Sequence, residues 1–109
     1  MTNYFYCFQS RYQEVTKIGI TNHPEDRLKT HLLNGLVEDD SAYLMELINP
    51  TEGNSANQIE QDLRDAFRQH IAGYDLIYST KEEAITKAKS KAIGRGLRFK
   101  LKTMKFSDL

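Results

Sequence analysis

The sequence predicts one α+β domain, a small central antiparallel or mixed β-sheet flanked by helices. Short runs rich in aromatic and β-branched residues alternate with segments of helical periodicity, in the order ββαβαβα. The 109 residues, of which 39% are hydrophobic, suffice for one modest core. We therefore expect a domain over residues 1–93, followed by a basic C-terminal segment over residues 94–109.

A β-hairpin is expected at the start of the chain. Residues 3–9 are crowded with aromatic side chains of high strand propensity, which predicts the first strand. A polar connection over residues 10–14 leads to a second, antiparallel strand from Val15 to Thr21. Gly19 interrupts this strand, and a glycine inside a strand usually marks a bulge or the close approach of another group.

The next segment, residues 21–35, has the signals of a helix. Pro24 suits its first turn and Gly35 its C-terminal stop. Arg27 and His31 are four residues apart, so they are expected on one face of this helix. A leucine stripe on a neighbouring face is expected to meet the core: Leu28, Leu32 and Leu36.

A second helix is expected over residues 55–72, after an acidic loop at 36–41 and a strand at 42–48. Ser55 and Gln58 form a capping box at its start. Its predicted core stripe recurs every four residues: Ile59, Leu63, Phe67 and Ile71.

The C-terminal part continues with a short strand at 74–79 and a third helix at 81–93, which Thr80 and Glu83 open. Residues 97–106 alternate apolar and basic side chains, as either an edge strand or an amphipathic extended tail would.

The charge is distributed unevenly along the chain. Residues 1–80 hold six Lys and Arg against twelve Asp and Glu, whereas residues 81–109 hold nine against three. A basic segment behind an acidic body indicates contact with a polyanion, and a solvated helix with an irregular terminus is the plainer alternative.

Several classes of protein are not expected from this composition. No apolar run approaches the roughly 20 residues of a membrane helix, and the N-terminus lacks the features of a signal peptide. Cys7 is the one cysteine, which suits a reducing, cytoplasmic environment.

Five side chains of different chemistry fall on neighbouring predicted elements. Each has an ordinary structural role when taken singly, such as a core tyrosine or a solvated helix carboxylate. Together they offer a phenol, an ammonium, a guanidinium, an imidazole and a carboxylate, which is a set that suits phosphodiester hydrolysis. The candidate catalytic residues are Tyr6, Lys17, Arg27, His31 and Glu60.

The roles of these residues follow from their chemistry. Arg27 can clamp the nonbridging phosphate oxygens, and Glu60 is a hard oxygen ligand for Mg²⁺. Tyr6 can act as general base if a nearby cation lowers the pKa of its phenol from about 10. We expect Lys17 to supply this cation, provided that the hairpin register places both side chains on one face.

The motifs resemble those of the GIY-YIG endonuclease superfamily, in the branch common in phages and other viruses. Its first motif is similar to residues 4–6 and its second to Lys17-Ile18-Gly19, at the usual spacing of eleven residues. Its arginine, the following histidine and its metal-binding glutamate match Arg27, His31 and Glu60. Lys17 stands where most members have the second tyrosine, and no asparagine follows Glu60 in the position of the late family asparagine.

The resemblance implies a hydrolase that uses Mg²⁺ or Mn²⁺ to cut one DNA strand per site, leaving 5′-phosphate and 3′-hydroxyl ends. It implies DNA as partner, with specificity gained from an appended region or from a homodimer, and the lack of a long apolar run predicts no membrane partner. A virus-encoded protein of this kind would act in the host-cell cytoplasm. Basic residues expected to contact nucleic acid are Lys29, Lys89, Arg95, Arg98, Lys100 and Lys102.

Two alternatives to the nuclease stay open. The first is a non-catalytic nucleic-acid-binding or inhibitory protein on the same fold, which the missing asparagine and the acidic body favour. The second is an unrelated protein-interaction domain that uses the acidic loop Glu38-Asp39-Asp40 as its contact surface.

Overall fold

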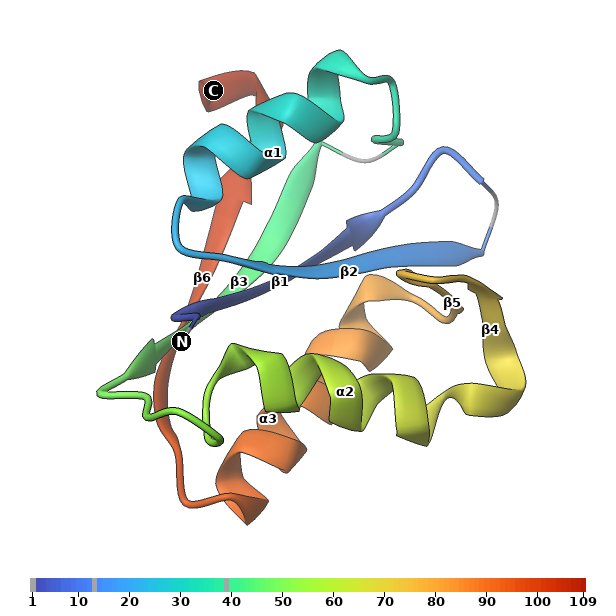
Figure 1. Cartoon of the computed structure of the whole chain (residues 1–109). Helices are drawn as coiled ribbons and strands as arrows, with labels where there is room; N and C mark the ends of the chain where they lie inside the picture. The colour runs from blue at the N-terminus through green and yellow to red at the C-terminus, as the bar shows by residue number, and fades with distance from the viewer. Residues whose placement is uncertain (1, 13, 39) are drawn as a thin grey trace.

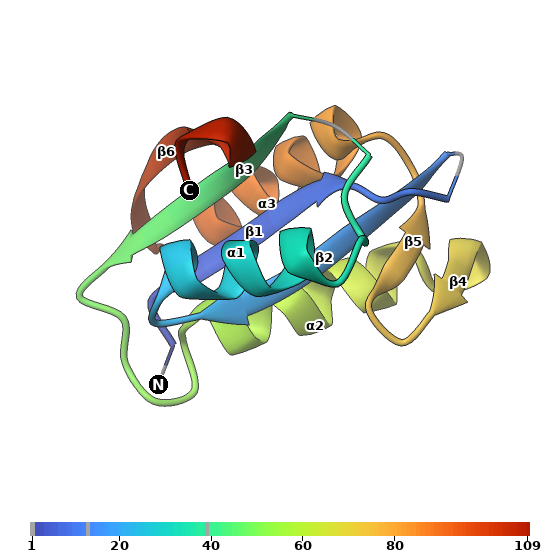
Figure 2. The same ribbon diagram turned by 90° about the horizontal axis from the view of Figure 1, so that it is seen from above.

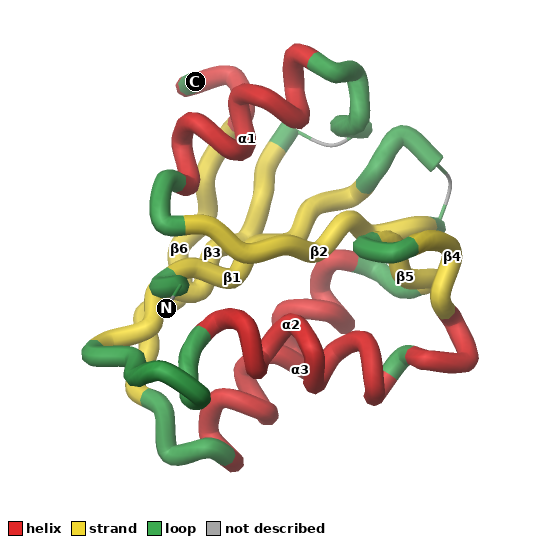
Figure 3. Tube along the Cα trace, in the orientation of Figure 1, coloured by secondary structure: helices red, strands yellow, loops and turns green. Residues whose placement is uncertain are grey.

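The structure is a computed structural model of the chain, and it describes residues 2–12, 14–38 and 40–109. Strands and helices follow one another along the chain as drawn in Figure 1 and Figure 3. They are β1 (Tyr4–Gln9), β2 (Val15–Thr21), α1 (Pro24–Leu33), β3 (Ser41–Ile48), α2 (Ala56–Ala66), β4 (Ile71–Gly73), β5 (Leu76–Tyr78), α3 (Lys81–Gly94) and β6 (Arg98–Lys105). Two short 3₁₀ turns are η1 (Arg68–His70) and η2 (Phe106–Asp108).

The described strands form one sheet in the order β4-β5-β2-β1-β3-β6, and every neighbouring pair is antiparallel. The predicted α+β class is therefore confirmed. Strand β5 pairs with β2 only from Val15 to Lys17, and the N–H of Ile18 donates to the carbonyl oxygen of Asp75. Beyond Ile18, this edge of β2 has no main-chain partner among the described residues.

The sheet separates two layers of helix. Helix α1 covers one face, and α2 and α3 cover the other (Figure 1 and Figure 2). Side chains alternate along β1, so Phe5 and Cys7 pack toward α2 and α3, whereas Tyr6 and Phe8 pack toward α1. Each face of β1 therefore belongs to a different core cluster.

Helix α1 does not present the expected leucine stripe to the core. Leu28 is buried, but Leu32 is 38% exposed and His31 is buried instead. The helix spans only ten residues and meets the sheet through positions three apart, so the inward face passes through His31 rather than Leu32. Phe106 fills the adjoining space and lies edge-on to Phe8, with 5.5 Å between ring centroids.

Helix α2 is shorter than predicted. Its capping box at Ser55 is present and Ile59 and Leu63 are fully buried, as expected. The helix ends before Phe67, whose φ of −106° and ψ of 18° depart from helical values, and the turn η1 follows. Ile71 therefore belongs to strand β4 and is 38% exposed, because the chain turns back here into the β4–β5 hairpin.

The basic residues 97–106 form an edge strand rather than an extended tail. Strand β6 pairs with β3 over eight positions, from Ser41 opposite Lys105 to Ile48 opposite Arg98. Phe106, directly after the strand, is buried. The C-terminal segment thus contributes both a strand and a core side chain to the domain. None of the helices in the described ranges combines the length and apolarity needed to cross a membrane.

Candidate functional site

The candidate site is built around the point where Tyr6 crosses Gly19. The hairpin register places these two residues opposite each other on β1 and β2. A Cβ atom at position 19 would collide with the hydroxyl oxygen and Cζ of Tyr6. Glycine therefore lets the phenol ring lie across β2, so of the two alternatives predicted at Gly19, a bulge or a close approach, the structure has the close approach.

His31 binds the Tyr6 hydroxyl from helix α1. Its Nε2 lies 2.8 Å from the hydroxyl oxygen, and its Nδ1 is buried with no hydrogen-bond partner among the described residues. The pKa of His31 is lowered from 6.5 to about 4; burial is the largest cause, the positive charges of Lys17 and Arg27 add to it, and the charge of Asp75 opposes it. The imidazole is therefore neutral at neutral pH.

The pKa of the Tyr6 phenol is raised rather than lowered. Burial is the largest cause, the charges of Asp75 and Glu60 add to it, and Arg27 opposes it. The expectation that Lys17 would lower this pKa is wrong. Lys17 shares the face of Tyr6 but lies opposite Phe8, and its Nζ pairs with Oδ2 of Asp75 at 2.8 Å.

A chain of ion pairs runs from this face around the unpaired edge of β2. It begins with Lys17 and Asp75, and Oδ1 of Asp75 then accepts from Nη2 of Arg64 at 2.8 Å. The same Nη2 lies 2.8 Å from Oε1 of Glu60, one turn earlier on α2. The four side chains carry two positive and two negative charges, which lie close enough together to balance.

Among the described residues, Glu60 is connected to the other candidate catalytic residues only through this chain of ion pairs. Tyr6, Lys17, Arg27 and His31 lie on the face of the sheet that α1 covers, whereas Glu60 projects from α2 on the other side. The charges of Glu60 and Asp75 act on the pKa of Tyr6, so both carboxylates lie within electrostatic reach of the phenol. Burial raises the pKa of Glu60 itself, and the charge of Arg64 opposes that rise.

Arg64 and Asp75 were not among the candidates taken from the sequence. Arg64 follows Glu60 at a spacing of four, which predicts a helical ion pair. Nothing local marks Asp75, because the β4–β5 turn is what brings it to Arg64. Tyr74 in this turn completes the arrangement: the Arg64 guanidinium lies 4.1 Å from its ring centroid, and Nε donates to its carbonyl oxygen at 3.2 Å.

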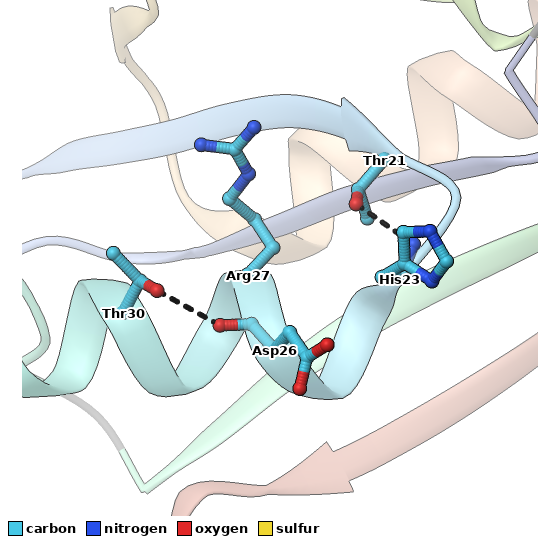
Figure 4. A pocket seen from close by; sticks show the side chains of 5 residues that line it. All are labelled: Thr21, His23, Asp26, Arg27 and Thr30. Carbon is cyan, nitrogen blue, oxygen red and sulfur yellow. Dashed lines mark hydrogen bonds between the residues drawn. The ribbon is translucent and has the colours of Figure 1, made fainter.

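Arg27 is the exposed cation of the site. Figure 4 shows its side chain extending from α1 toward β2, while Asp26 points the other way. The guanidinium makes no hydrogen bond or ion pair with any described residue. Arg27 borders an open hollow of about 240 Å³, whose lining is Thr21, His23, Asp26, Arg27 and Thr30. The other candidate catalytic residues do not line this hollow.

The carboxylates near Arg64 have the donor chemistry of a magnesium site. Mg²⁺ typically takes one or two carboxylates together with water and substrate phosphate oxygens. Glu60 and Asp75 supply two such groups, and a cationic guanidinium already lies between them. No group of three or more His, Cys, Asp or Glu residues arranged to hold a metal ion occurs in the described part of the chain.

The six basic residues predicted to contact nucleic acid do not share one surface. Arg98, Lys100 and Lys102 alternate along β6 on the α1 side of the sheet, in register with Ile48, Glu46 and Leu44, respectively, and Lys102 pairs with Glu46 at 2.8 Å. Lys29 is exposed on α1, and Lys89 is exposed on α3 across the sheet. Arg95 donates to both carboxylate oxygens of Asp62, so its positive charge is already balanced by a carboxylate.

The acidic loop that could serve as an alternative contact surface is described in part. Glu38 and Asp40 are exposed, and Asp39 lies outside the described residues. Glu38 is tied to the sheet by its N–H, which donates to the carbonyl oxygen of Gln9.

Comparisons of this chain with protein-family models, with curated proteins and with solved structures find no significant match. The motif resemblance therefore remains the basis for the assignments that follow.

Proposed function

We propose that the protein is a metal-dependent endonuclease of the GIY-YIG type that hydrolyses phosphodiester bonds in DNA. One observation carries the proposal. A phenol, a neutral imidazole and an unpaired guanidinium gather beside β2, and a carboxylate pair lies within electrostatic reach. Each group has a part in phosphodiester hydrolysis, and shared chemistry requires such a common location.

Arg27 is the group we assign to the phosphate. Its guanidinium is exposed and makes no ion pair with the described residues, so a phosphate can bind it without first displacing a carboxylate. The bound phosphate adds a negative charge near His31, which raises the affinity of this imidazole for a proton.

His31 and Tyr6 are the groups we assign to proton transfer. The Nε2 atom of His31 is neutral and lies 2.8 Å from the phenol oxygen, so it is placed to take the phenol proton. The Tyr6 oxygen then acts as base toward a water molecule. Lys17 orients Asp75 through their ion pair rather than acting on the phenol.

We assign Mg²⁺ or Mn²⁺ to Glu60, with Asp75 as a second carboxylate. A bound divalent ion supplies Lewis-acid polarisation of the phosphate. The residues fit such an ion because two carboxylate oxygens already converge on one cationic nitrogen.

Nicking of supercoiled plasmid DNA tests the proposal. The wild type should convert supercoiled to open-circular plasmid with Mg²⁺ and not with EDTA. Arg27→Ala and Glu60→Gln should each reduce the rate by about 10²-fold or more, because Arg27 and the metal ion held by Glu60 both stabilise the negative charge of the transition state. Lys87→Ala is a matched control, since Lys87 is exposed on α3 on the other side of the sheet. Absence of Mg²⁺-dependent nicking, or equal rates in all variants, would refute the proposal.

A non-catalytic nucleic-acid-binding or inhibitory role is the second candidate. It is favoured by the engagement of both carboxylates by Arg64 and by the raised pKa of Tyr6. In that case the protein binds DNA with strong salt dependence and leaves the plasmid intact. A gel-shift titration at several salt concentrations, run beside the nicking assay, distinguishes the two functions.

A further inference from the structure

Arg64 holds two carboxylates through one nitrogen. Its Nη2 lies 2.8 Å from Oε1 of Glu60 and 2.8 Å from Oδ1 of Asp75. The guanidinium is stacked on the ring of Tyr74, a side chain that is 78% exposed. The side chains of Arg64, Glu60 and Asp75 are 18%, 12% and 28% exposed, so the cluster is partly buried.

This geometry places a positive charge where a divalent cation would have to bind. Two adjacent carboxylates repel each other unless a cation lies near both, and Arg64 meets that need. With Lys17, the cluster is already balanced at two positive and two negative charges. A divalent ion added beside Arg64 would leave an excess of positive charge in a partly buried site, so the two compete.

Asp75 keeps other contacts when Arg64 leaves. Oδ2 of Asp75 is bound by Lys17 at 2.8 Å, independently of the oxygen that Arg64 holds. Asp75 is also fixed through its main chain, because its carbonyl oxygen accepts from the N–H of Ile18. Tyr74 offers the displaced guanidinium an exposed aromatic face.

We propose that Arg64 is an internal cation that occupies the Glu60–Asp75 pair and is displaced when a divalent metal ion binds. Arg64 thereby sets the metal concentration at which the site fills. The inference rests on the proposed function in one respect, the assignment of the metal ion to Glu60.

Metal binding to Arg64→Gln tests this directly, without reference to cleavage. Titration calorimetry with Mg²⁺, or the loss of free Mn²⁺ signal in electron paramagnetic resonance, gives the affinity. The variant should bind about tenfold more tightly than the wild type, because no charge-assisted hydrogen bonds must first be broken. Arg68→Gln is the control, because it removes the same charge from the exposed turn after α2 and should leave the affinity unchanged.

A fluorescence variant reports the displacement itself. The sequence contains no tryptophan, so Tyr74→Trp creates a single reporter that keeps the stacking surface for Arg64. Addition of Mg²⁺ should change its emission when Arg64 is present and leave it unchanged in the Tyr74→Trp/Arg64→Gln double variant. Circular dichroism and melting temperature verify that each variant is folded.

Failure of the inference can be distinguished from failure of the proposed function. If the wild type and Arg64→Gln bind Mg²⁺ equally, or the variant binds more weakly, Arg64 does not compete and the metal site stands without it. If neither binds Mg²⁺ or Mn²⁺, the metal assignment falls and this inference falls with it.

Discussion

The hydroxyl oxygen of Tyr6 and Nε2 of His31 lie 2.8 Å apart in a buried position, where they join strand β1 to helix α1. His31 packs beside both Tyr6 and Phe8, with ring centroids 5.7 and 5.4 Å away. A titratable ring therefore occupies a core position of α1 where an apolar residue would be usual. Its protonation state affects both the stability of the domain and the chemistry proposed for Tyr6.

The free energy of unfolding should decrease as the pH is lowered through the range in which His31 titrates. The pKa of His31 is about 4 in the folded protein against an ordinary value of 6.5. The unfolded chain therefore takes up a proton below pH 6.5, while the folded chain resists protonation until about pH 4. The free energy of unfolding should thus decrease between these limits, on the order of 2 kcal/mol, and stay constant above them as far as His31 is concerned.

Urea unfolding at pH 7, 5.5 and 4.5 measures this dependence. His31→Gln should be less stable at pH 7 and should show a smaller decrease on acidification. An equal decrease in the variant and the wild type would assign the acid sensitivity to other groups.

Gly19→Ala should destabilise the fold by about 1–3 kcal/mol, because the added methyl group collides with the Tyr6 ring. Gly94→Ala is the matched control. No heavy atom lies within 4 Å of a Cβ at position 94, and the residue ends helix α3. The control should be neutral or slightly stabilising. Thermal unfolding decides the matter, and similar melting temperatures for the two variants would mean that the ring moves aside freely.

Lys17→Met should raise the pKa of His31 above its value in the wild type. Lys17 lowers this pKa and also pairs with Asp75, whose charge acts in the opposite direction. Loss of the ammonium removes the first effect and uncovers the second. Titration of the imidazole by NMR measures the shift. Lys29→Met is the control, because Lys29 is exposed on α1, the helix that carries His31, and it should leave the pKa of His31 unchanged. The same shift in both variants would contradict a local effect of Lys17.

Removal of residues 94–109 should unfold the domain rather than trim a binding tail. The truncation removes β6, which pairs with β3 at eight positions, and it removes the buried side chain of Phe106. Loss of that side chain alone typically costs about 3–5 kcal/mol. Circular dichroism of the truncated chain checks this prediction, and a cooperative transition near the wild-type melting temperature would show that the strand is dispensable.

The contribution of β6 to DNA binding is better tested by substitution. Arg98 and Lys100 are exposed and form no ion pair with the described residues, so Arg98→Thr/Lys100→Thr should keep the fold. DNA affinity should fall, and the slope of log K against log salt should decrease by about 2. The same number of charges removed from α3 by Lys87→Gln/Lys89→Gln should have a smaller effect. Equal losses would indicate that only net charge matters.

The parts of the fold predicted best from sequence were those set by local patterns. The aromatic run at Tyr4 and the capping boxes at Ser55 and Thr80 each depend on neighbours along the chain, and each is present. The inward face of α1 was predicted wrongly, because 3.6-residue periodicity leaves open whether Leu32 or His31 meets the sheet. That choice depends on Phe8 and Phe106, which come from distant strands and turns.

The candidate site was predicted in the same uneven way. Short motifs marked Tyr6, Arg27, His31 and Glu60, which carry reactive groups at recognisable spacings. The ion-pair partners Asp75 and Arg64 were not predicted, because the pairing of Asp75 with Lys17 and Arg64 depends on the β4–β5 turn meeting β2. The direction of the shift in the Tyr6 pKa was predicted wrongly, because burial outweighs the charge of Arg27 and burial is a property of the folded chain.

The pairing of β3 with β6 has a consequence for synthesis of the chain on the ribosome. Strand β3 is completed at Ile48, but its outer edge waits until β6 emerges after α2 and α3 have been made. At roughly 5–20 residues per second, this edge and the apolar residues beside it stay uncovered for several seconds. The nascent protein therefore passes through an interval in which a chaperone or another nascent chain can pair with β3 before its own strand arrives.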